Sequence, residues 1–203
     1  MLKIKIKLLL FIISILKLSN CLDNGLGITP IGWNSWNKFG CNITERIIID
    51  TIDAFNTSGL IEAGYNYINI DDCWQKRRDI NGKIIPDSVA FPKGMKYLAD
   101  YAHSKGLKFG LLSDAGTLTC AGRPGSLGYE ETDAKTYAEW GIDYLKYAFC
   151  NNEYTNSKAA YIKMRDALNN TGRPIFYSLC SWGEEEVSIW GKILAIVGEQ
   201  LQV

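Results

Sequence analysis

Two adjacent carboxylates, Asp71 and Asp72, directly follow an apolar segment, 65–70, that is rich in aromatic and β-branched residues. At the end of a buried strand both side chains can reach into a cleft, where they could bind hydroxyl groups, transfer protons or coordinate a hard metal ion. The alternative is a solvated loop entry in which the carboxylates cap a following helix. Because the pair follows an apolar segment directly, we favour the functional interpretation.

Lys146 and Asp114 stand at the ends of two further apolar segments, 142–147 and 107–112. A charged residue at the mouth of a buried strand indicates a binding or catalytic role, but a lysine paired with a nearby aspartate would be purely structural. The sequence leaves both interpretations open for these two residues. His103 falls on the surface of an expected helix, and we interpret it as structural.

Tryptophans accompany the first and the last of the expected strands. A flat apolar ring beside carboxylates suits a sugar, whose C–H face is apolar and whose rim carries hydroxyl groups. Trp33 is the better candidate for such a wall, whereas Trp36 is expected to anchor the core or a loop. Trp182 fits a pocket wall or the core equally well.

Apolar strands alternate with amphipathic helices, at about 30 to 40 residues per unit, which is typical of a parallel sheet built from βαβ units. The long segments after the strands are polar, and 75–94 is expected to be a polar loop, whereas the connections after the helices are short and marked by glycine. This asymmetry places the functional residues at the carboxyl ends of the strands. The expected strands lie near 31–36, 65–70, 107–112, 142–147 and 174–179, and the helices at 45–58, 95–104, 129–140, 157–169 and from about 185.

The fold class is therefore α/β. No G-x-G-x-x-G or Walker sequence follows the first strand, which argues against a nucleotide-binding open sheet and favours a (β/α)₈ barrel of the TIM type. Such a barrel needs about 250 residues. With 203 residues and five expected strands, the barrel is expected to stop after about five of its eight strands.

The composition excludes several classes of partner. Acidic and basic residues number 22 each, so a nucleic-acid partner is not expected. The first 21 residues combine Lys3, Lys5 and Lys7 with an apolar run, 8–16, and a small polar end, which is the order of a secretory signal peptide. The apolar run is too short for a stable membrane anchor, and we expect the secretory pathway, ending outside the cell or in a lysosome- or vacuole-like compartment.

Cysteines and glycosylation sequons fit that compartment. Of the six cysteines, Cys21 lies near the expected cleavage site, which leaves five disulfide candidates and therefore one cysteine over. No C-x-x-C or histidine-rich spacing indicates a metal site, so we expect no metal. The candidate glycosylation sites are Asn42, Asn56 and Asn169.

Seven short motifs, in order along the chain, resemble the melibiase family, which comprises α-galactosidases among the glycoside hydrolases. The resemblance covers residues 25–195 without large gaps. The motifs are IGWNSW (31–36), YINIDDCW (67–74), HSKGLK (103–108), SDAG (113–116), TCAG (119–122), PGS (124–126) and WGIDYLK (140–146).

This resemblance implies a (β/α)₈ barrel followed by a small antiparallel β domain, and hydrolysis of terminal α-D-galactosyl residues from oligosaccharides and glycoconjugates. The family mechanism is a double displacement with retention, in which one Asp is the nucleophile and another the acid/base. No cofactor is implied. Trp33 would form a wall of the galactose pocket, Asp71 and Asp72 would accept hydrogen bonds from galactose hydroxyls, and Lys146 would contact ring hydroxyls. The implied disulfides are Cys41–Cys73 and Cys120–Cys150.

This sequence departs from the family pattern at the most reactive position. Where the family has its nucleophilic Asp, this chain has Ala148. Ser181 stands where a hydroxyl-binding Glu is typical, and Leu112 where a Tyr is common. The family's acid/base Asp, its last three strands and its C-terminal β domain have no counterpart here. We therefore expect an inactive chain, with a galactoside-binding remnant or a non-functional, truncated product as alternatives.

The expected organisation is a signal peptide at 1–21, a partial catalytic barrel at 22–195 and an atypical tail at 196–203. Codons for Asn-Ser-Trp-Arg-Thr-Thr, which relatives carry after this point, spell Ile196 to Leu201 when they are read one base out of frame. A frameshift or a gene-model error is thus our hypothesis for the tail. The sequence does not predict an oligomeric state.

Overall fold

The computed structural model describes residues 30–152, 156–183 and 186–191. The expected signal peptide and the atypical tail lie outside these residues. Among the described residues, no helix is long and apolar enough to cross a membrane.

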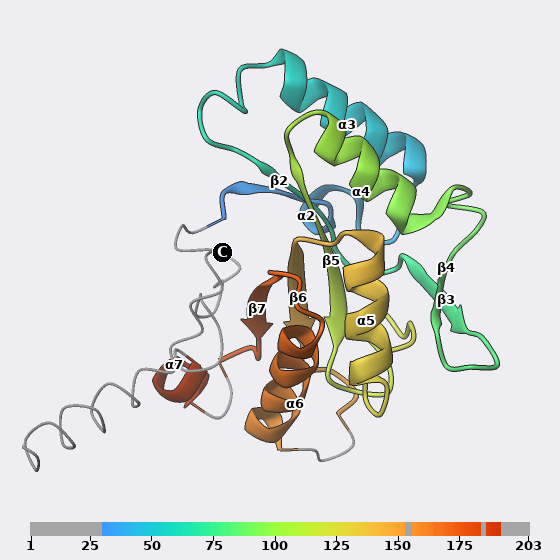
Figure 1. The fold of residues 1–203 in the computed structure, drawn as a ribbon, viewed down its shortest axis with the longest axis vertical. Coiled ribbons are helices and arrows are strands. Elements are labelled where there is room, and N and C mark those ends of the chain that lie inside the picture. The colour runs from blue at the N-terminus through green and yellow to red at the C-terminus, as the bar shows by residue number, and fades with distance from the viewer. Residues whose placement is uncertain (1–29, 153–155, 184–185, 192–203) are drawn as a thin grey trace, which may run out of the picture.

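Five parallel strands form one curled sheet, in the order β1-β2-β5-β6-β7 (Figure 1). Neighbouring strands are also neighbours in the βαβ series, so each crossover returns beside the strand it left. The result is a half-barrel, which confirms the expected truncated (β/α)₈ fold. The strands are β1 (Gly32–Asn34), β2 (Tyr67–Ile70), β5 (Lys108–Asp114), β6 (Tyr144–Ala148) and β7 (Phe176–Cys180).

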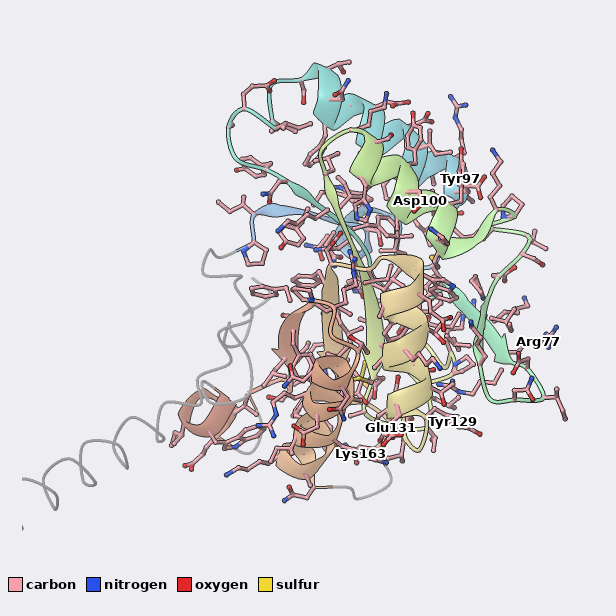
Figure 2. All side chains as sticks on the ribbon, in the orientation of Figure 1. Arg77, Tyr97, Asp100, Tyr129, Glu131 and Lys163 are labelled. Carbon is pink, nitrogen blue, oxygen red and sulfur yellow. A yellow bond between two sulfur atoms is a disulfide. The ribbon has the colours of Figure 1, made fainter. Side chains whose placement is uncertain are left out.

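Four long helices cover the convex face of this sheet (Figure 1). The helix expected from about residue 185 is present in the described residues as one short turn, α7, and a second short helix, α2, follows β1. Charged and aromatic side chains on the outer surfaces of the helices point away from the sheet (Figure 2). The helices are α2 (Trp36–Phe39), α3 (Glu45–Thr57), α4 (Gly94–Ser104), α5 (Glu130–Trp140), α6 (Ser157–Asn170) and α7 (Val187–Trp190).

Helix α3 illustrates how sequence pattern sets these elements. Thr44 has extended backbone dihedrals, and its hydroxyl accepts a hydrogen bond from the Ile47 amide, so it caps the first turn. Ile48, Ile52 and Phe55 recur on one face and are buried against the sheet. Burying three side chains of this size contributes about 1.5 to 3 kcal/mol each, which exceeds what helix propensity alone supplies.

Alternation along β6 separates the core from the functional face. Leu145 and Tyr147 point outward into the core beneath the helices, where Tyr147 packs against Tyr161 of α6. Lys146 and Ala148 are the intervening residues, so their side chains point to the opposite, concave face. A half-barrel of this kind therefore presents every second strand residue to its interior.

The segment 75–94 is not a featureless polar loop as the sequence indicated. It contains an antiparallel hairpin of β3 (Gln75–Arg78) and β4 (Ile84–Pro86), with Gly82 in the left-handed region at the turn. The prediction was wrong because the charged run in β3 has no period-two hydrophobic pattern. Long-range contacts stabilise the strand instead: Arg78 donates two 2.7 Å hydrogen bonds to Asp133 of α5.

Candidate functional site

A cavity opens at the carboxyl ends of β2, β5, β6 and β7, where the loop asymmetry of the sequence placed the functional residues. It brings together three of the predicted site residues, Asp71, Asp72 and Lys146, with Ala148 beside them. The full lining is Trp36, Asp71, Asp72, Leu112, Cys120, Lys146, Ala148, Cys180 and Trp182.

Asp71 is held by a charged partner from across the half-barrel. Lys146 Nζ lies 2.8 Å from Asp71 Oδ2, and both side chains are largely buried. The same oxygen accepts a hydrogen bond from Asn34 Nδ2 at 2.9 Å, while Ser35 Oγ accepts one from the Asp71 amide. Lys146 is therefore paired with an aspartate, as the structural interpretation expected, and it also lines the cavity.

Asp72 is held by a different element, the loop after β5. Its Oδ1 accepts a 2.7 Å hydrogen bond from the Thr119 hydroxyl, and its Oδ2 accepts one from the Ala121 amide at 2.9 Å. The Cys73 amide also donates to Oδ1. Two donors occupy the lone pairs of Oδ1, so Asp72 is fixed in orientation and keeps acceptor capacity for a further partner on Oδ2.

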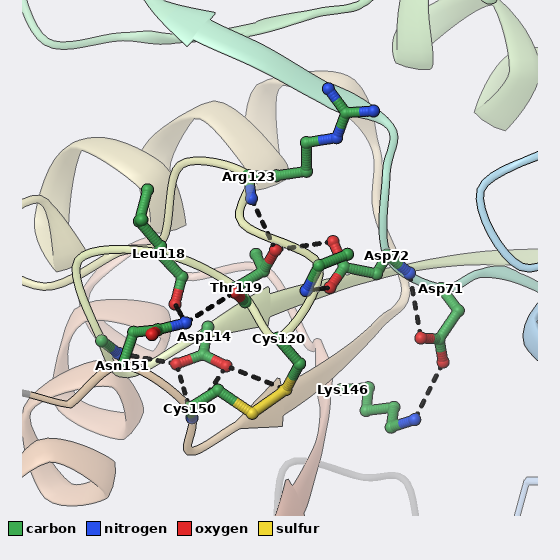
Figure 3. Close-up of a disulfide and its surroundings, with 12 residues drawn as sticks. Asp71, Asp72, Asp114, Leu118, Thr119, Cys120, Arg123, Lys146, Cys150 and Asn151 are labelled. Atoms are coloured by element: carbon green, nitrogen blue, oxygen red, sulfur yellow. Dashed lines mark hydrogen bonds and ion pairs between the residues drawn. A yellow bond between two sulfur atoms is a disulfide. The ribbon is translucent and has the colours of Figure 1, made fainter.

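Two disulfides tie the loops that carry these groups, and Figure 3 shows the one between Cys120 and Cys150. The structure contains the two pairs that the resemblance implies, Cys41–Cys73 and Cys120–Cys150. The second pair joins the loops after β5 and β6, and Asn151 Nδ2 reinforces it by donating to the Thr119 carbonyl at 2.9 Å. Cys180 takes part in neither disulfide and is buried at the cavity wall.

Asp114 supports the loops and does not line the cavity. Its carboxylate is fully buried and accepts hydrogen bonds from the amides of Gly116, at 2.7 Å, and Cys150, at 3.0 Å. Burial raises the pKa of Asp114 to about 7, although both amides act in the opposite direction. The sequence had left a functional role open here, and the contacts favour the structural one.

Ala148 lines this cavity at the end of β6. It pairs in register with Asp114 of β5 on one side and with Cys180 of β7 on the other. Its backbone is intact, because the Ala148 carbonyl accepts a 2.9 Å hydrogen bond from the Ala115 amide. Its side chain offers only a methyl group, which can neither attack a carbon atom nor hold a proton.

The tryptophans do not fall as the sequence indicated. Trp36, at the start of α2, lines the cavity, whereas Trp33 is absent from the lining and packs edge-on against Phe39, 6.1 Å between ring centroids. Trp182 stands at the rim with 59% of its surface exposed. Strand parity explains the position of Trp33, since it pairs in register with the core residue Ile68 and packs against the same core.

The three sequon asparagines all have exposed side chains. Asn42 precedes α3, Asn56 lies in its last turn, and Asn169 lies in the last turn of α6. Their glycosylation stays a prediction.

Chemically, this arrangement can bind hydroxyl groups. It combines two buried carboxylates, one ammonium group and apolar rings, which suits a ligand that carries hydroxyls on one edge and C–H groups on a face.

Comparison with known proteins identifies the family. The sequence profile of the family described as Alpha galactosidase A matches residues 28–191. The chain belongs to the α-galactosidase family. Over 174 residues it is 57% identical to the α-galactosidase of Coffea arabica, and over 173 residues it is 56% identical to that of Cyamopsis tetragonoloba. These alignments cover 84% of this chain but 46% and 42% of the two relatives.

Solved structures agree with this membership of the α-galactosidase family. The α-galactosidase I of Mortierella vinacea is 50% identical and superposes with a TM-score of 0.83, over 85% of this chain and 45% of that one. The Saccharomyces cerevisiae α-galactosidase solved with raffinose is 48% identical with a TM-score of 0.82, over 85% and 39% of the two chains. The chain therefore spans less than half the length of the relatives it matches.

Proposed function

We propose that this chain recognises terminal α-D-galactosyl groups of oligosaccharides or glycoconjugates and does not hydrolyse them. The observation that carries the proposal is the cavity that Asp71, Asp72 and Lys146 line together with the methyl-bearing Ala148. Three of the four binding residues that the family resemblance implies line one cavity, and the position of the implied nucleophile has no reactive atom.

Recognition follows from the hydrogen-bonding capacity of these residues. Asp71 and Asp72 are acceptors held in fixed orientations, and Lys146 has three N–H groups of which one is used by Asp71. A galactose hydroxyl donates well to an ionised carboxylate, and such a charge-assisted hydrogen bond contributes about 1.5 to 3 kcal/mol. Trp36 and Trp182 offer apolar surface to the face of the ring.

Loss of hydrolysis follows from position 148. A retaining mechanism requires a carboxylate that forms a covalent bond to the anomeric carbon. A methyl group cannot form that bond, and loss of such a group lowers the rate by several orders of magnitude. The partial barrel at 22–195, the signal peptide at 1–21 and the secretory destination remain part of this proposal.

Calorimetry and a turnover assay on the full chain, expressed in a secretory host, test it. We expect galactose to bind more tightly than its C4 epimer glucose, with no release of p-nitrophenol from its α-galactoside. Asp72→Asn should weaken galactose binding by about 10-fold or more, whereas Asp100→Asn, an exposed change on α4, should not.

Each result has a distinct meaning. Turnover at the rate of ordinary α-galactosidases would refute the non-catalytic half of the proposal. A soluble, folded chain that binds neither sugar would refute the recognition half and favour a product without function of its own.

A further inference from the structure

The junction between β1 and α2 holds Asp71 at two points, one on its side chain and one on its main chain. Asn34 Nδ2 donates a 2.9 Å hydrogen bond to Asp71 Oδ2, and Ser35 Oγ accepts a 3.0 Å hydrogen bond from the Asp71 amide. Asn34 and Ser35 do not belong to the cavity lining, whereas Asp71 does. Any influence of these two residues on a ligand must therefore pass through Asp71.

Strand parity directs the Asn34 side chain to the concave face of the half-barrel. Trp33, the residue before it, packs against the core beneath the helices. Consecutive strand side chains point to opposite faces, so Asn34 points toward the interior. Its register partner on β2 is Asn69, two residues before Asp71. Asn34 thus lies beside the end of β2 that carries the carboxylate.

The orientation of the Asn34 amide group follows from its second contact. Asn34 Oδ1 accepts a 2.9 Å hydrogen bond from the Trp36 amide, whose N–H group can only donate. The oxygen must therefore face Trp36, and the NH₂ group is left for the Asp71 carboxylate. The contact with Trp36 is an Asx turn that connects β1 to α2. Asparagine meets both requirements, whereas aspartate would meet only the first.

The donors around Asp71 leave little acceptor capacity for a sugar (Figure 3). Oδ2 accepts from Lys146 Nζ at 2.8 Å and from Asn34 Nδ2, so both of its lone pairs are used. Oδ1 accepts from the Asp72 amide at 2.9 Å. Counted over the contacts of the described residues, one acceptor position remains on Asp71, and it lies on Oδ1.

We propose that Asn34 is a positioning residue that directs the remaining acceptor of Asp71 toward one hydroxyl group of the bound galactosyl ring. Its neutral NH₂ group holds Oδ2 without adding charge to the Asp71–Lys146 pair. Without this donor Oδ2 regains a lone pair, and Oδ2 is held only by Lys146, whose long side chain is flexible. The carboxylate can then rotate and turn Oδ1 away from the ligand. This inference rests on the proposed galactose recognition.

The variant Asn34→Asp separates the two contacts of the amide group. It keeps an oxygen for the Trp36 amide and, at pH 7, replaces the NH₂ donor with a second carboxylate beside Asp71, with little change in shape. We expect galactose binding, measured by calorimetry, to weaken about 10-fold or more. Asn81→Asp makes the same change of charge in the exposed turn of the hairpin and should leave the affinity unaltered.

A second variant removes the donor without adding charge. Asn34→Ser keeps a hydroxyl oxygen for the Trp36 amide, but its side chain is too short to reach Asp71. We expect it to weaken galactose binding about 5-fold or more. Full affinity in Asn34→Ser would show that repulsion alone explains Asn34→Asp and would overturn the proposal.

Deoxygalactoses supply a readout that a general loss of structure would not give. The affinities of the wild type and Asn34→Asp are compared for galactose and for its 2-, 3-, 4- and 6-deoxy derivatives, with NMR titration for the weak ligands. Because Asn34 acts on one acceptor, its effect should disappear for one derivative, which lacks the hydroxyl that Asp71 accepts, and persist for the others.

The outcomes separate this inference from the proposed function. An unaltered affinity in Asn34→Asp, or an equal loss for every derivative, would overturn the role of Asn34 and leave galactose recognition by the wild type in place. A wild type that binds no galactose would overturn both.

Discussion

Replacing Arg78 by Met should destabilise the protein more than any other single surface-accessible change in the hairpin. The Arg78 guanidinium donates two 2.7 Å hydrogen bonds to the carboxylate of Asp133 and a third, 2.8 Å long, to the Gly82 carbonyl. It also lies 4.0 Å from the centroid of the Tyr129 ring. The Asp133 side chain is 0% exposed and that of Arg78 is 12% exposed, so this is a buried ion pair.

Removing one partner of such a pair leaves an uncompensated buried charge and costs about 3 to 5 kcal/mol. That is a large share of the total stability of an ordinary domain, about 5 to 15 kcal/mol. Replacing both partners, in Arg78→Met with Asp133→Leu, removes the buried charge, so we expect the double variant to be more stable than the single one. Arg77→Met, an exposed change in the same strand, should alter stability by less than about 0.5 kcal/mol.

The loss of stability in Arg78→Met should depend on pH in a defined direction. Burial raises the pKa of Asp133, and the hydrogen bonds from Arg78 lower it. Without Arg78 the pKa rises further, so the native state holds a proton that the unfolded state has released. Between the two pKa values the unfolded state binds fewer protons, and the free energy of unfolding therefore falls as pH rises. The deficit of Arg78→Met should be smaller at pH 5 than at pH 8.

Urea unfolding followed by far-UV circular dichroism, at pH 5 and pH 8, measures these free energies. A deficit below about 1 kcal/mol at pH 8 would mean that the pair is screened and not buried in solution. An equal deficit at both pH values, or a double variant as unstable as the single one, would contradict the charge argument itself.

Three further predictions concern the site and the compartment. Thr119→Val removes the hydroxyl that orients Asp72 and should weaken galactose binding about 10-fold, as measured by calorimetry. An unchanged affinity at an unchanged melting temperature would show that the hydroxyl does not position the carboxylate. Ala148→Asp should raise hydrolysis of aryl α-galactosides with activated leaving groups at least about 10-fold over the wild type, because such a leaving group needs no general acid. Melibiose, whose leaving group is a sugar hydroxyl that needs a general acid, should stay uncleaved. Equal rates for the variant and the wild type would argue against this position as the nucleophile site. Expression in a secretory host should give a glycosidase-sensitive mass shift that disappears when the three sequon asparagines are replaced by Gln, and a protein with no shift would count against entry into the secretory pathway.

The elements with the strongest sequence patterns were predictable. The five strands and four long helices follow from hydrophobic runs, capping residues and glycines, all of which act locally. Asp71, Asp72 and Lys146 could be assigned to one face because parallel strands end at the same edge of a sheet. The sequence thus indicated the location of the cavity correctly.

Features that depend on distant partners were not predictable. The β3–β4 hairpin is stabilised by Arg78 and Asp133, which are separated by 55 positions. Trp36 and not Trp33 lines the cavity because Trp33 pairs with the core residue Ile68 of β2, and this register depends on a strand that lies far along the chain. Asp114 looked like Asp71 in sequence, and only its amide donors from two loops distinguish a support from a ligand-binding group.

At the strand end, a change of the side chain at position 148 can alter the chemistry of the site and leave the fold intact. The Ala148 backbone keeps its hydrogen bond and its place in the ladder, so a methyl group there leaves folding, overall shape and sequence identity to relatives essentially unaltered. Measurements that average over the whole molecule, such as melting curves, scattering profiles or alignment scores, are therefore blind to the side chain at the position where the family resemblance implies the nucleophile. Any transfer of catalytic activity between members of such a family must be decided atom by atom at this position.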